Sequence, residues 1–147
     1  MLMRAIVAWC VCWFLVCAGL MVDTFLPGGP VAPPWLSFVP FPALVPAFIT
    51  VMFTLNGRVF GRMPWRVMWD ALRPLPVLVK GALAVLFAAA LVNFAVMMAT
   101  TPTGHHDDGP GLSFQRGYVG NGAWLFAVTA ALAYGILLRR RAADAAR

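Results

Sequence analysis

The residues best suited to chemistry form one short cluster, "GHHDDG", which places His105, His106, Asp107 and Asp108 side by side. Imidazole nitrogens and carboxylate oxygens are ligands for Zn²⁺ and other divalent ions. Four adjacent side chains seldom converge on one ion, however, and the flanking Thr, Gly and Pro residues are typical of a loop. We therefore expect a solvated loop, with a metal site or a metal-dependent enzyme as the alternative.

Three cysteines, Cys10, Cys12 and Cys17, fall within one long apolar run. On a helix, Cys10 and Cys17 share a face and Cys12 points elsewhere. A membrane thiol oxidoreductase would need cysteine pairs at the outer surface, and apolar surroundings blunt thiol reactivity. We interpret the three cysteines as packing residues.

Two polar residues within apolar runs are candidates for transport. Asp23 lies near the end of the first run, and an ionisable group inside a membrane is a functional suspect. Asn93 lies in the third run, where it is expected to hydrogen-bond to a neighbouring helix. Beyond these, the sequence contains no Ser-His-Asp set, no phosphate loop and no paired intramembrane carboxylates, so we expect a non-enzymatic protein without a cofactor.

Composition places the chain in a membrane. Of its 147 residues, 62% are hydrophobic and 11% are charged, whereas soluble domains have about 45–50% and about 25%. The net charge is +6, but no nucleic-acid motif is present and the bases sit beside apolar runs, so anionic headgroups are the expected partner and nucleic acid is not. Ten Arg against one Lys suggests a bacterial inner membrane.

Four apolar runs define the predicted spans, at about 5–26, 43–60, 77–99 and 118–138. A helix needs roughly 20 apolar residues to cross a membrane, and lipid leaves the helix as the default structure. We therefore predict an all-α integral membrane protein with a single four-helix transmembrane domain, residues 1–147.

The basic residues predict the orientation. With both termini in the cytoplasm, ten of the eleven bases fall inside and only Arg116 falls outside, as the positive-inside rule requires. The inner bases are Arg4, Arg58, Arg62, Arg66, Arg73, Lys80, Arg139, Arg140, Arg141 and Arg147. The alternative is that the first run is a cleaved signal peptide, which would leave three spans.

The stretch Pro27–Pro46 holds seven of the twelve prolines. We expect a turn or polyproline connection up to Pro34, extended backbone at Val39 and Phe41, and a helix that begins near Pro42 or Ala43. Leu36–Pro42 is then either an interfacial lid or an irregular segment embedded in the membrane.

Between the second and third spans, the pattern predicts a short amphipathic helix that lies in the cytoplasmic interface. Its apolar face is Trp65, Met68, Trp69 and Leu72, and its polar face is Arg66, Asp70 and Arg73. We expect Trp65, Arg66, Trp69 and Arg73 to contact lipid or a partner, and Lys80 to reach the same interface.

Small residues recur every fourth position in the fourth span, at Ala123, Ala127, Ala131 and Gly135. The third span has a similar series at Ala84, Ala88, Ala95 and Ala99. Such spacing lets helices approach closely. It predicts packing of the third span on the fourth, or of the fourth, through Ala127, Ala131 and Gly135, on a partner.

The leading hypothesis is a non-enzymatic accessory, assembly or immunity-type subunit that acts through helix and interfacial contacts with a partner membrane subunit or a second copy. The alternative is a small oligomeric transporter or channel that uses the proline-broken second span and Asp23.

Overall fold

The computed structural model describes residues 1–24, 33–56, 65–100 and 112–147. Within these ranges every element is helical: α1 (Leu2–Asp23), the 3₁₀ helix η1 (Pro34–Phe38), α2 (Pro40–Asn56), α3 (Trp65–Leu72), α4 (Val77–Thr100) and α5 (Leu112–Ala145). Four of the helical stretches are long and apolar enough to cross a membrane. The predicted all-helical architecture with four such stretches is confirmed.

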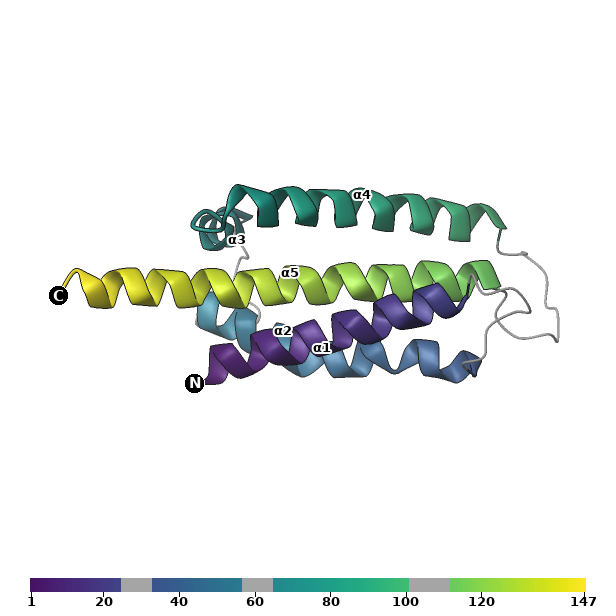
Figure 1. The fold of residues 1–147 in the computed structure, drawn as a ribbon, viewed down its shortest axis with the longest axis horizontal. Coiled ribbons are helices and arrows are strands. Elements are labelled where there is room, and N and C mark those ends of the chain that lie inside the picture. Colours follow the sequence, from purple (N-terminus) through teal and green to yellow (C-terminus); the bar gives the residue numbers. More distant parts are fainter. Residues whose placement is uncertain (25–32, 57–64, 101–111) are drawn as a thin grey trace.

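The four long helices run side by side, and both chain termini lie at the same end of the bundle, here called the termini end (Figure 1). The opposite end, where α1 and α4 finish and α2 and α5 begin, is the loop end. The boundaries depart from the predicted spans mainly at α2, which begins at Pro40, and at α5, which extends past both predicted limits. The predicted end of the second span, near residue 60, lies outside the described residues.

Helix α5 is the central element, because it contacts α1, α2, α3, α4 and η1. Its 34 residues give a rod of about 51 Å. Helices α1 and α2 pack together on one side of α5, and α4 lies on the other side (Figure 1). The fold is therefore a three-helix core with a fourth helix attached to its central member.

The α1–α5 contact contains two of the three cysteines. Cys10 and Cys17 are fully buried, whereas Cys12 is exposed, which confirms the prediction that Cys12 points away from the other two. Trp13 of α1 stacks on Phe126 of α5, with ring centroids 6.1 Å apart. The thiols thus serve as small side chains in a tightly packed seam.

The proline-rich entry to α2 is more helical than predicted. Pro33 is extended (φ −64°, ψ 143°) as expected, but η1 follows at once and Val39 is helical (φ −60°, ψ −35°). Helix α2 starts at Pro40 and continues through Pro46. The prediction of extended backbone at Val39 and a start near Pro42 or Ala43 was therefore wrong.

The physical reason is that proline fixes φ near the helical value and that a segment in lipid has to satisfy its own backbone groups. Pro42 and Pro46 have no N–H to donate to the carbonyls of Phe38 and Pro42, the usual acceptors four residues earlier. Two side chains add hydrogen bonds to other carbonyls of the same segment: the Trp9 indole donates to the Ala43 carbonyl (3.0 Å) and the Thr50 hydroxyl to the Pro46 carbonyl (2.7 Å).

Candidate functional site

Helix α4 is attached to the rest of the protein through one face. The residues of that face are buried or partly buried and recur at spacings of three and four: Val79, Leu83, Leu86, Ala90 and Asn93. They define a single seam against α5. Only 6% of the α4 span is buried, against 44% of the α5 span, so among the described residues most of the α4 surface has no protein neighbour.

Two polar groups lie in this seam. Asn93 faces Gly120 of α5 so closely that a β carbon on Gly120 would stand 2.7 Å from the Asn93 Nδ2. Trp124 of α5 packs its ring on Phe87, with centroids 5.0 Å apart. Its Nε1 is buried without a hydrogen-bond partner in the part of the chain that the structure describes, which makes the seam less favourable than a fully satisfied one.

The opposite face of α4 carries a stripe of small residues that the sequence singled out only in part. All of its members are exposed: Gly81, Ala84, Ala88, Ala95 and Ala99, here called the small-residue stripe. A β carbon added at Gly81 would meet nothing within 4 Å. The expectation that Ala84, Ala88, Ala95 and Ala99 pack the third span on the fourth was wrong, because they point away from α5.

Two uses were expected for the small residues of α5, packing on the third span or on a partner, and their burial within this chain fits the first. Ala131 and Gly135 are buried and Ala127 is partly buried. By helical spacing they share a face with Gly120 and Trp124, the face that meets α4. At the termini end this face meets α3 instead, since the backbone of Ala71 lies directly against Gly135.

The amphipathic connector forms a helix, α3, whose predicted apolar residues Met68 and Leu72 are partly buried against the core. Ala71 is fully buried and Leu75, just after the helix, is 3% exposed, whereas Trp69 is 70% exposed. Arg73 is also exposed. Trp65 and Arg66 belong to α3, but their side chains lie outside the described set.

Ala71 lies against the bundle because α3 approaches α5 closely. The Ala71 carbonyl oxygen stands where a β carbon of residue 135 would be, so this approach requires a glycine at position 135. The Lys80 side chain was expected to reach the membrane interface, and in the structure it contacts the end of α3. Its Nζ donates a 2.8 Å hydrogen bond to the Arg73 carbonyl, and a cation at the end of a helix stabilises the last carbonyls.

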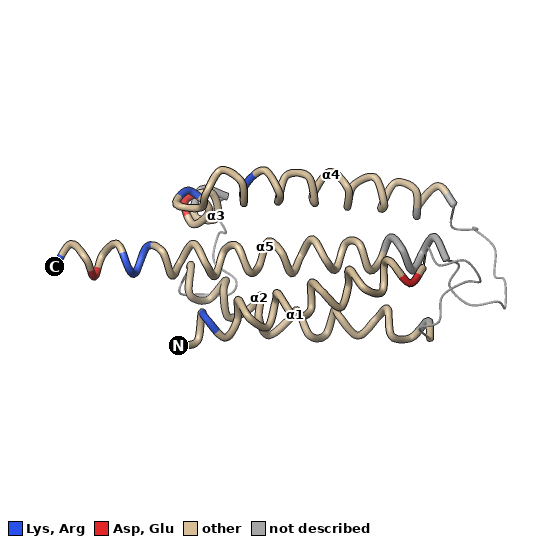
Figure 2. Tube along the Cα trace, viewed as in Figure 1, with Lys and Arg blue, Asp and Glu red and all other residues tan. Residues whose placement is uncertain are grey.

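Charged residues are segregated along the bundle. Arg4, Arg73, Lys80 and Arg139–Arg141 lie toward the termini end, and Asp23 lies at the loop end (Figure 2). Asp70 and Asp144 are the acids found beside the bases. This segregation suits the predicted orientation; that the termini end is cytoplasmic stays a prediction.

The remaining candidate residues are not brought together. Asp23 is the last residue of α1 and is partly buried. The cluster His105–Asp108 lies outside the described residues, and within the described ones no three His, Cys, Asp or Glu side chains gather where they could hold a metal ion. The structure thus supplies contact surfaces, which are the α4 stripe and the face of α3 that carries Trp69.

The fold and composition define a class: a membrane-embedded protein with four apolar helices of spanning length. Comparison of the chain with protein-family models, with curated proteins and with solved structures returned no match in any of the three.

Proposed function

We propose that this protein is a non-enzymatic accessory or assembly subunit, in the class that includes immunity-type proteins, and that α4 is the helix by which it binds a membrane-spanning helix of a partner. The observation that carries the proposal is the geometry of α4, which is attached along one seam and presents the small-residue stripe on the opposite side. The partner is a helix of another membrane protein.

The physical argument starts from the absence of a hydrophobic driving force between helices in lipid. Association there depends on close packing, which small residues permit because the two backbones can approach. Gly81, Ala88 and Ala95 recur every seven residues, with Ala84 and Ala99 beside them. A seven-residue repeat keeps one face toward a partner over the length of a left-handed helix pair.

The interfacial part of the proposal concerns α3. Trp69 is 70% exposed and Arg73 is exposed at the end of the same helix. An exposed tryptophan and an arginine beside it suit the headgroup region. We propose that α3 rests on anionic headgroups and holds α4 at a fixed depth for its partner.

The test compares two alanines of α4 that differ only in direction. Ala88 lies in the small-residue stripe, and Ala89 is exposed but lies off it. Ala88→Leu is expected to reduce recovery of the partner from detergent extracts of the native membrane by about tenfold, which corresponds to about 1.4 kcal/mol. Ala89→Leu is expected to leave recovery unchanged. Equal effects of the two variants would refute the proposal.

A photoreactive residue at position 88 identifies the occupant directly. A crosslink to a different membrane protein supports the proposal. A crosslink only to a second copy of the chain would instead show that the stripe is a homo-oligomer interface. It would refute the proposal that the stripe binds a different membrane protein.

The transport hypothesis stays a prediction. It places function at Asp23 and at an irregular second span, whereas α2 is one helix from Pro40 to Asn56 and the irregularity lies at its junction with η1. A substrate flux lost in Asp23→Asn at unchanged expression would favour transport over the accessory role.

A further inference from the structure

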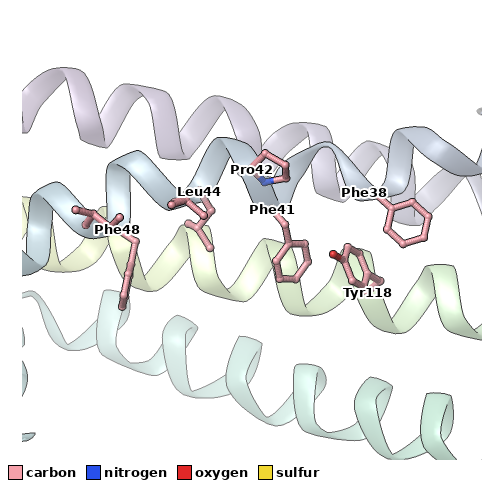
Figure 3. Close-up of a pocket in the computed structure, with 8 residues that line it drawn as sticks. Phe38, Phe41, Pro42, Leu44, Phe48 and Tyr118 are labelled. Carbon is pink, nitrogen blue, oxygen red and sulfur yellow. The ribbon is translucent and has the colours of Figure 1, made fainter. Parts of the chain in front are cut away.

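A second surface feature is independent of α4. An open hollow of about 500 Å³ lies along α2 and is lined by eight residues, seven from η1 and α2 and one, Tyr118, from α5 (Figure 3). Its size falls within the range of about 300–1,000 Å³ that is usual for ligand sites. We call it the α2 hollow.

Aromatic rings close the α2 hollow at the loop end. Tyr118 packs beside both Phe41 and Phe38, with ring centroids 4.2 Å and 4.9 Å away (Figure 3). From Phe38 the lining continues along α2 to Ile49, a length of about 16 Å for a helix.

The α2 hollow opens at membrane depth. Its lining residues all belong to the spans Trp35–Leu55 and Tyr118–Ala145. Val45 is 53% exposed and Ile49 is 38% exposed, so the open side faces hydrocarbon. None of the eight lining residues is charged, and seven have only carbon and hydrogen in their side chains.

Something apolar has to occupy such a hollow. Water needs two to four polar partners, which these walls do not offer. An empty hollow would forfeit the dispersion contacts of every wall atom. A partner helix is about 10 Å wide with its side chains, much thicker than a single acyl chain.

We infer that the α2 hollow is a binding site for one acyl chain of a membrane phospholipid. The hollow runs along a membrane-spanning helix, and lipid chains lie in that same direction. Its walls carry no charged group that would bind a headgroup, so the site selects the chain. No residue of α4 lines this hollow, so lipids on the exposed residues of α4 are expected to exchange without preference.

The experiment uses the full chain in nanodiscs of phosphatidylcholine that contain a small fraction of a phosphatidylcholine with a diazirine on one acyl chain. After irradiation, adducts are mapped by mass spectrometry. Adducts per exposed residue are expected to be about tenfold more frequent on Phe38–Ile49 and Tyr118 than on Val85 and Val92 of α4, a ratio equivalent to about 1.4 kcal/mol. An even distribution over all exposed apolar residues would overturn the inference.

Two variants sharpen the result. Val45→Trp places a large side chain at the rim and is expected to remove the excess of adducts in the hollow. The matched control is Val85→Trp on α4, which starts 69% exposed and is expected to leave the excess unchanged. If Val45→Trp proves misfolded by circular dichroism or gel filtration, Ile49→Trp replaces it. If a folded tryptophan variant at position 45 or 49 keeps the excess of adducts in the hollow, the proposed acyl-chain site is refuted.

Discussion

Gly135 of α5 has no room for a side chain, because the backbone carbonyl of Ala71 in α3 lies where a β carbon would stand. The Ala71 carbonyl carbon is 2.9 Å from the same point. Ala71 is itself fully buried. This contact joins the short helix α3 to the central helix of the bundle, and the first prediction follows from it.

Gly135→Ala is expected to destabilise the protein by about 1–3 kcal/mol, because a rigid backbone group cannot move aside as a side chain could. Reversible unfolding in mixed micelles measures the change. Gly81→Ala is the matched control: its β carbon meets nothing within 4 Å, and the better helix propensity of alanine predicts a gain of about 0.5–1 kcal/mol. Equal effects at the two glycines would show that Gly135 does not clamp α3.

Trp9→Phe is expected to cost about 1 kcal/mol, because it removes the indole donor from the Ala43 carbonyl while it keeps most of the aromatic surface. The same unfolding measurement tests this. Trp69→Phe removes an indole that is 70% exposed and is expected to change stability little. A neutral Trp9→Phe would mean that the proline-rich helix needs no support from α1.

Cys12 is expected to react with a small apolar thiol reagent in detergent well before Cys10 and Cys17, which are fully buried while Cys12 is exposed. Access to the sulfur controls such reactions. Mass spectrometry of the digested protein identifies the modified cysteine over time. Simultaneous modification of all three under native conditions would contradict the packing of α1 on α5.

The predicted orientation can be tested with single cysteines in a background that lacks the natural three. Pro33 and Arg139 are both exposed and lie at opposite ends of the bundle. In intact cells a membrane-impermeant maleimide is expected to label Pro33→Cys and to spare Arg139→Cys, as the positive-inside rule requires. The reverse pattern would invert every side assignment made from the basic residues.

The sequence by itself determined that the chain is helical, that it contains four stretches of spanning length and that a short amphipathic helix follows the second. It also separated Cys12 from Cys10 and Cys17. These features follow from local rules, because helix hydrogen bonds join residues four apart and run length decides what can cross a bilayer. The positions of the basic residues relative to the four apolar runs can likewise be read from the sequence alone.

Only the tertiary structure decided which face of each helix meets a neighbour. A membrane helix such as α4 is apolar all around, so no face is marked as the inner one, in contrast to an amphipathic helix of a soluble protein. In the structure α5 is the central helix, the small-residue stripe of α4 faces away from it, and Gly135 lies against Ala71. The tertiary structure also gave Val39 helical dihedral angles at the junction of η1 and α2, where the local preference for extended backbone lost to the need of buried backbone groups for hydrogen bonds.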